Sequence, residues 1–164
     1  MSRYDGAVPK KRRDQPSLAL DDQLCFALYA ASRAVTSYYR PLLDDLGLTY
    51  PQYLVLLVLW ESGEVTVKEV GAKLYLDYGT LSPLLKRLET AGLVKRTRCA
   101  DDERSVTVSL TDRGEALRTE ASCVPAAIQA AMALDDRELV RVREAVQAVA
   151  TAVRDAPSAR EADG

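Results

Sequence analysis

The sequence contains no histidine, and this absence argues against several kinds of chemistry at once. None of its 164 residues is a histidine. Histidine is the commonest general base and metal ligand, and it is the usual partner of a catalytic serine or cysteine. We therefore expect a protein that is not an enzyme, with no catalytic residues, no metal site and no cofactor.

Cysteine is also scarce, and its spacing argues against a structural role. The chain has three cysteines and no C-x-x-C pair. An odd count without such a pair argues against a disulfide scaffold and against a zinc site. Any special role for a thiol in this chain would have to be that of a single reactive group.

Long apolar runs and a large net charge are missing as well. No apolar run approaches the roughly 20 residues of a membrane span, and the first residues, Met1 to Tyr4, lack the apolar core of a signal peptide. We expect a cytoplasmic protein without a membrane partner. The net charge is −2, so any nucleic-acid binding would have to come from local charge.

The centre of the chain predicts two short helices followed by a β-hairpin. A capping box at Thr66 and Glu69 opens a helix over 67–74, and a second helix starts near Asp77 and ends before Gly92. Residues 93–99 and 105–111 then alternate polar and apolar side chains, as strands do. A hairpin directly after a helix-turn-helix is typical of a winged-helix domain.

Longer helices flank this centre. One starts at Asp21 or Asp22, with Pro41 expected to kink or end it, and a buried helix follows the capping box of Thr49 and Gln52. Thr111 starts a long helix that Pro125 should bend. A last helix carries an apolar seam that fits either a second subunit or an ordinary intrachain contact: Leu139, Val142, Val146, Val149 and Val153.

These elements predict a mainly α fold, a winged helix-turn-helix whose long N- and C-terminal helices form a dimerisation region. We expect dimerisation helices with a sensor cysteine over 21–50 and 112–155, around a DNA-binding domain over 51–111. Residues 1–20 and 156–164 are expected to be disordered tails. The first contains a basic cluster, Lys10 to Arg13, which is either solvated or an arm that touches nucleic acid.

A local concentration of positive charge predicts double-stranded DNA as the partner. Residues 86–98 carry five positive side chains and one negative, a net +4, in an otherwise acidic chain. We expect the start of the second helix to read bases, basic side chains to hold phosphates and Arg104 to enter the minor groove. The alternative is a winged-helix module used for protein contacts. The candidate DNA-binding residues are Asp77, Tyr78, Gly79, Thr80, Ser82, Pro83, Lys86, Arg87, Arg98, Asp102 and Arg104.

Several motifs resemble one family of regulators. Asp102 and Arg104, followed by Leu110-Thr111, match the D-x-R…L-T wing signature of the MarR family. The blocks 24–29, 48–54 and 74–77 are similar to its OhrR branch of organic-peroxide-sensing repressors. The resemblance covers roughly residues 18–153, and it implies a homodimer that binds an inverted repeat and is released when a reactive cysteine is oxidised by an organic hydroperoxide.

The resemblance nominates Cys25 as that cysteine, with Tyr39 and Tyr50 of the partner subunit as hydrogen-bond donors to its thiolate. Helical geometry is consistent with a site shared between subunits. Cys25, Tyr29 and Tyr39 lie on one polar-aromatic stripe of the first helix, but Cys25 and Tyr39 are roughly 21 Å apart along its axis. Two such helices crossing antiparallel would bring Cys25 of one to Tyr39 of the other.

The sequence leaves alternatives open for the resolving thiol and for the function. The resemblance suggests Cys123 as a resolving cysteine, although it lies about two turns earlier than expected, and a low-molecular-weight thiol could resolve Cys25 instead. Cys99 is an incidental strand residue in this interpretation. Rival functions are a thiol peroxidase that uses Cys25 and a MarR-type regulator released by a small phenolic ligand bound between helices.

Overall fold

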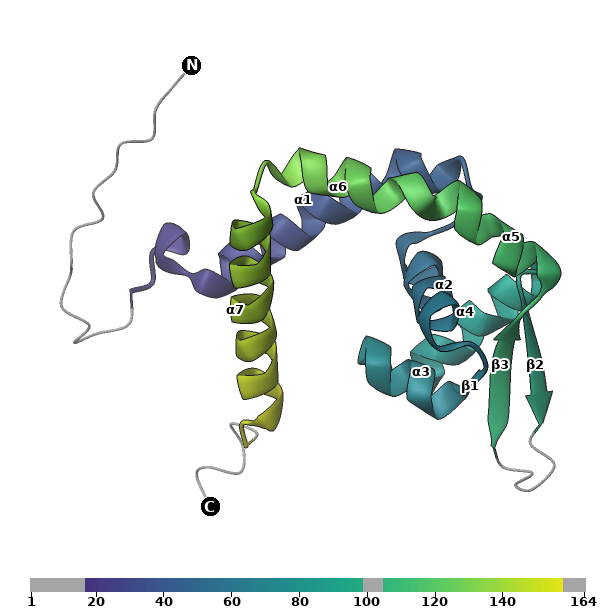
Figure 1. The fold of residues 1–164 in the computed structure, drawn as a ribbon. Helices are drawn as coiled ribbons and strands as arrows, with labels where there is room; N and C mark the ends of the chain where they lie inside the picture. Colours follow the sequence, from purple (N-terminus) through teal and green to yellow (C-terminus); the bar gives the residue numbers. More distant parts are fainter. Residues whose placement is uncertain (1–16, 99–104, 158–164) are drawn as a thin grey trace. The chain divides into compact units, whose positions relative to one another are not determined.

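The structure, a computed structural model, describes residues 17–98 and 105–157. The chain divides into two compact units, one up to Ser37 and one from Tyr38 onward. Figure 1 shows the order of the helices and strands along the chain. The expected basic cluster at residues 10–13, the turn at the tip of the wing and most of the expected C-terminal tail lie outside the described residues.

The first unit holds the start of the longest helix. A single 3-10 turn, η1 (Leu20–Asp22), precedes α1 (Leu24–Asp44), so α1 starts slightly later than the expected Asp21 or Asp22. The alternative in which Pro41 ends the helix was wrong, because α1 continues to Asp44. Pro41 lies in the last turn, where its missing N–H removes one hydrogen bond of the helix, and the fully buried Leu43 anchors that turn in the core.

The second unit contains the predicted winged helix. Its helices are α2 (Tyr50–Ser62), α3 (Val67–Leu74) and α4 (Tyr78–Thr90). The capping box that opens α3 is present: the Thr66 amide donates to Glu69 at 2.7 Å, and the Glu69 amide donates to the Thr66 hydroxyl at 3.2 Å. At the end of α4, Gly92 has a φ of 70°, which glycine adopts without the cost that a side chain would add.

The wing is a three-stranded antiparallel sheet in the order β1-β3-β2. Strands β2 (Val94–Arg98) and β3 (Val106–Leu110) form the predicted hairpin, with Val94 opposite Leu110. The short β1 (Val65–Thr66) was not predicted, because two residues are too few to show an alternating pattern. It pairs with β3 and attaches the hairpin to the start of α3.

A single hydrophobic core joins α2 to the other elements of the winged helix. Helix α2 was expected to be buried, and it supplies Tyr53, Val55, Leu56, Val58 and Leu59 to the core. It packs against α3, α4, β3 and α5 (Asp112–Glu120). Because α4 and the strands of the wing share this core, the core fixes the exposed face of α4 relative to the wing.

The helix expected after the wing is interrupted. A 3-10 turn, η2 (Ala121–Cys123), separates α5 from α6 (Val124–Met132), where the sequence predicted one helix bent by Pro125. Proline has no amide to donate to the carbonyl of Ala121. The amide of Val124 donates to that carbonyl instead, which tightens the chain into the 3-10 turn.

The last helix, α7 (Asp136–Asp155), begins at the predicted capping box. Asp135 and Glu138 exchange hydrogen bonds of 3.0 and 2.8 Å. None of its side chains is buried in the single chain, and Val146 and Val153 of the apolar seam are 42% and 70% exposed. Among the described residues, no helix is long and apolar enough to cross a membrane.

Candidate DNA-reading surface and thiol site

The start of α4 is held by its own cap. The Thr80 amide donates to Asp77 Oδ1 at 2.9 Å, and the Thr80 hydroxyl donates to Asp77 Oδ2 at 2.8 Å. These hydrogen bonds from Thr80 lower the pKa of the Asp77 carboxyl group. Both carboxylate oxygens of this predicted DNA-binding residue are therefore used within the protein, where they shape the helix that presents its neighbours.

The other predicted reading residues lie on the surface. Tyr78 is 71% exposed, and Gly79, Thr80 and Pro83 are exposed while Ser82 is partly buried. Lys86 and Arg87 continue along the exposed side of α4, and Arg98 ends β2. The remaining predictions, Asp102 and Arg104, lie outside the described residues.

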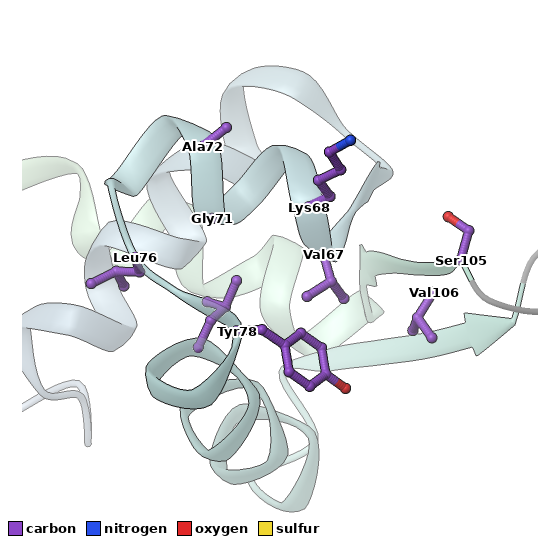
Figure 2. Close-up of a pocket in the computed structure, with 9 residues that line it drawn as sticks. Val67, Lys68, Gly71, Ala72, Leu76, Tyr78, Ser105 and Val106 are labelled. Atoms are coloured by element: carbon purple, nitrogen blue, oxygen red, sulfur yellow. The ribbon is translucent and has the colours of Figure 1, made fainter. Parts of the chain in front are cut away.

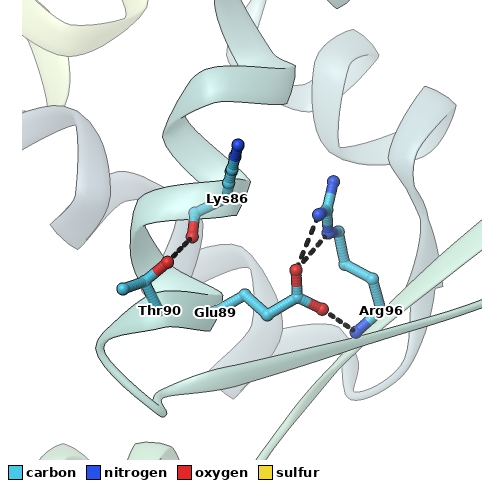
Figure 3. A network of polar contacts seen from close by, with 4 residues as sticks. All are labelled: Lys86, Glu89, Thr90 and Arg96. Atoms are coloured by element: carbon cyan, nitrogen blue, oxygen red, sulfur yellow. Dashed lines mark hydrogen bonds and ion pairs between the residues drawn. The ribbon is translucent and has the colours of Figure 1, made fainter.

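One cation of the predicted positive cluster is neutralised. Arg96 on β2 forms an ion pair with Glu89 on α4, with 2.6 Å between Arg96 Nη2 and Glu89 Oε2 (Figure 3). This pair removes one positive and one negative charge, so the net charge of residues 86–98 stays at +4. It is carried by four cations for which the structure gives no ion-pair partner over 17–98 and 105–157: Lys86, Arg87, Lys95 and Arg98. The sequence could not distinguish Arg96 from them.

A hollow of about 470 Å³ lies between α3, the start of α4 and β3. Figure 2 shows the ring of Tyr78 from α4 beside Val106 of β3, with Lys68 of α3 on the far side. The lining is otherwise apolar apart from Ser105. This hollow, which sequence patterns do not reveal, shares Tyr78 with the candidate reading surface.

Tyr39 and Tyr50 form an aromatic cluster with two further rings in the second unit. The ring centroids of Tyr39 and Tyr50 are 4.6 Å apart, and Tyr53 lies 5.9 Å from Tyr39. Trp60 packs edge-on against Tyr53 at 6.2 Å. Tyr53 and Trp60 were not predicted as neighbours of this site, although Tyr50 and Tyr53 are three residues apart on one helix and therefore share a face.

Burial in the cluster disfavours ionisation of its phenols. Burial, with smaller contributions from Tyr50 and Tyr53, raises the pKa of Tyr39 to about 12 from 10.0. Burial also raises the pKa of Tyr50. At neutral pH both hydroxyl groups carry their protons and can donate a hydrogen bond to an anion.

This shift predicts a loss of stability at alkaline pH. The folded chain holds the Tyr39 proton more tightly than the unfolded chain, so the contribution is complete below pH 10 and is lost as the pH rises towards about 12. Tyr39→Phe should therefore lose less stability than the wild type between those values. Denaturant unfolding followed by the fluorescence of the single tryptophan measures this. Tyr29→Phe, at an exposed phenol, is the matched control; an unchanged decline in Tyr39→Phe would contradict the assignment.

The two described thiols are exposed and lie in different units. Cys25 and Tyr29 belong to the first unit, on α1. Arg33 stacks on the Tyr29 ring at 5.6 Å and donates to its hydroxyl at 3.3 Å, a neighbour that the sequence analysis did not identify despite the i, i+4 spacing. Cys99 lies outside the described residues.

Cys123 affects the pKa of one tyrosine of the aromatic cluster. It ends η2, and its thiol donates to the carbonyl of Glu120 at 3.6 Å. Burial is the main reason that the pKa of Tyr53 is raised, followed by its neighbours Tyr50 and Cys123. Within the described part of the chain, no group of three or more Asp, Glu, Cys or His side chains could hold a metal ion.

Comparisons with known proteins agree with this architecture. The family model for the transcriptional regulators SarA/Rot matches residues 37–120. The organic hydroperoxide resistance transcriptional regulator of Bacillus subtilis is 49% identical over 129 residues, 79% of this chain and 88% of that protein. Reduced AbfR of Staphylococcus epidermidis bound to DNA aligns with a TM-score of 0.71 at 38% identity, covering 82% of this chain and 92% of that one. Overoxidised AbfR bound to DNA aligns with a TM-score of 0.66 at 41% identity, covering 80% and 93%.

Proposed function

The chain belongs to the SarA/Rot family of MarR-like winged-helix transcriptional regulators and is similar to the OhrR-type members, and we propose that it is a thiol-based sensor of organic hydroperoxides. As a homodimer with reduced Cys25 it binds an inverted repeat and represses transcription, and oxidation of Cys25 releases it. Its relatives are transcriptional regulators, so the chain is a regulator rather than an enzyme.

The observation that carries this proposal is the close pair of phenols, Tyr39 and Tyr50, whose ring centroids lie 4.6 Å apart. A thiolate is the nucleophile in peroxide chemistry, and hydrogen bonds to it favour its formation. Because α1 is uninterrupted from Leu24 to Asp44, Cys25 cannot reach the Tyr39 of its own chain, roughly 21 Å along the axis. The donors to Cys25 are therefore those of the partner subunit.

The oxidation is a two-electron step at sulfur. The Cys25 thiolate attacks one peroxide oxygen, the O–O bond breaks and an S–O bond forms, and the peroxide leaves as an alkoxide that takes up a proton. The resulting sulfenic acid condenses with a second thiol to a disulfide, and water is released. The second thiol is Cys123 or a low-molecular-weight thiol, and the electrostatic influence of Cys123 on Tyr53 supports Cys123.

A disulfide is the better candidate for the releasing form. Overoxidised AbfR was solved on DNA, which supports the idea that a further-oxidised cysteine is compatible with binding in this family. A disulfide to Cys123 would also constrain the chain at η2, the 3-10 turn that separates α5 from α6. Movement there would change the spacing of the two reading helices, which must match half-sites about one DNA turn apart.

A DNA-binding assay tests the function. We expect the reduced protein to bind a duplex with an inverted repeat, chosen by in vitro selection, and to lose most of this affinity after treatment with an organic hydroperoxide. If the released form is a disulfide, adding a reductant should restore its DNA binding. Consumption of peroxide should stop after about one equivalent per subunit; sustained consumption would favour a peroxidase instead.

The hollow beside Tyr78 supports the alternative function, release by a small phenolic ligand. Its apolar walls with Lys68, Tyr78 and Ser105 could hold an aromatic ring, and an occupant would compete with DNA for Tyr78. Release by such a compound under reducing conditions, with no response to hydroperoxide, would favour this alternative.

A further inference from the structure

We propose that Glu89 and Arg96 brace the wing against the reading helix, so that Glu89 strengthens DNA binding although its charge opposes that of DNA. This inference rests on the proposed DNA binding and concerns the geometry of the same surface. Neither residue needs to touch DNA. Both act as positioning residues for side chains that do.

The brace consists of three hydrogen bonds between α4 and β2. Arg96 donates from Nε at 2.9 Å and from Nη2 at 2.6 Å to Glu89 Oε2. The backbone amide of Arg96 donates to Glu89 Oε1 at 3.3 Å. Figure 3 shows both carboxylate oxygens of Glu89 directed at β2. One side chain thus holds both the backbone and the side chain of the strand.

The place of β2 in the sheet explains why such a brace is useful. In the described sheet β2 is at the edge, paired with β3 on one side, so alternate amides on its other side have no strand partner. Glu89 accepts one of these amides. Leu88 of α4 and Val94 of β2 are buried, so the pair joins a helix and a strand that also contribute to the apolar core.

Glu89 is in an unfavourable position unless it has a partner. It lies in the last turn of α4, where the helix dipole disfavours a negative charge. Hydrogen bonds from Arg96 lower the pKa of Glu89, so the contact favours the ionised carboxylate. An acidic residue here, next to a surface proposed to meet phosphates, is explained by its contact with Arg96.

The matched test compares two glutamates that each lose one negative charge. Glu89→Gln and Glu61→Gln change the net charge equally, and Glu61 is an exposed residue whose ion pair is with Lys73 at 3.3 Å. If only charge mattered, both changes would strengthen DNA binding. We expect Glu89→Gln to weaken binding about fivefold or more, from the loss of charge-assisted hydrogen bonds, and Glu61→Gln to leave it equal or slightly tighter.

A variant of Arg96 provides the second test. If it is a brace, Arg96→Gln should weaken binding without changing the slope of log affinity against log salt. A phosphate contact would lower that slope by about 0.9. The swapped pair Glu89→Arg with Arg96→Glu should recover only part of the affinity, because it restores the ion pair while arginine offers no acceptor for the backbone amide of residue 96. Equal or tighter binding by Glu89→Gln, or a lowered slope for Arg96→Gln, would overturn the brace.

Hydrogen exchange separates this inference from the proposed function. In the absence of DNA, Glu89→Gln should exchange the β2 amides faster than the wild type, while the amides of α2 remain protected. This result is expected even if the wild type fails to bind an inverted repeat, which would count against the proposed function alone. Unchanged protection of β2 would rule out the brace whatever the wild type binds.

Discussion

Cys25→Ser should remain on its operator at hydroperoxide concentrations that release the wild type. Serine preserves the size of the side chain at this exposed position of α1, but its hydroxyl does not form the anion that attacks the peroxide. Under reducing conditions we expect the variant to bind DNA within a few-fold of the wild type. After treatment the affinities should differ at least tenfold, as measured by fluorescence anisotropy on a selected inverted repeat.

Cys123→Ser is the matched control for this change. If Cys123 resolves the sulfenic acid, Cys123→Ser should still consume one peroxide, but it should show no Cys25–Cys123 bridge in non-reducing mass mapping. A small thiol added to Cys123→Ser should then restore release. Release of Cys25→Ser by hydroperoxide, at the same concentration as the wild type, would show that another group senses the oxidant.

The winged helix could be predicted because its signals are local. A capping box needs only two side chains three residues apart, and those at Thr66 and Asp135 mark helix starts in the structure. A glycine after a helix is equally local, as at Gly92. The change from a helical to a two-residue period then separates the hairpin from the helices.

Other parts of the fold depend on contacts between distant residues, which a local pattern does not contain. Pro41 was expected to disrupt α1, but the burial of Leu43 supports the last turn. The pairing of Glu89 with Arg96 depends on how closely β2 returns to α4. The sequence does not show this pairing, so Arg96 was counted there as a cation without a partner.

The thiol site depends even more on contacts that a local sequence pattern does not contain. Sequence and resemblance selected Cys25, Tyr39 and Tyr50, and the structure places the two tyrosines together with Tyr53. The helical spacing of α1 keeps Cys25 from the Tyr39 of its own chain. The complete site would thus be a property of the dimer, and its donors remain a prediction for the Cys25→Ser and Tyr39→Phe variants to test.

Gly114→Ala should destabilise the fold strongly, although alanine normally stabilises a helix. In an exposed helix this change gains about 1 kcal/mol. At Gly114, in the first turn of α5, a Cβ would overlap the carbonyl oxygen of Leu93 and lie 3.2 Å from Leu110 Cδ2. The neighbours are backbone and a strand side chain, so α5 must move away from the wing. We expect a loss of about 3 kcal/mol, at the upper end for overpacking.

The carbonyl group of Gly114 gives a second reason to expect a large loss of stability, because it is hydrogen-bonded to a side chain of α2. Trp60 Nε1 donates to the carbonyl oxygen of Gly114 at 3.0 Å, so the displacement of α5 breaks a hydrogen bond that the tryptophan fluorescence reports directly. Glu115→Ala, at the next and exposed position of α5, is the control and should change the stability by less than about 0.5 kcal/mol. If the two variants had equal denaturation midpoints, the close contact between Gly114 and Leu93 would be wrong. Helix α5 would then lie farther from the wing.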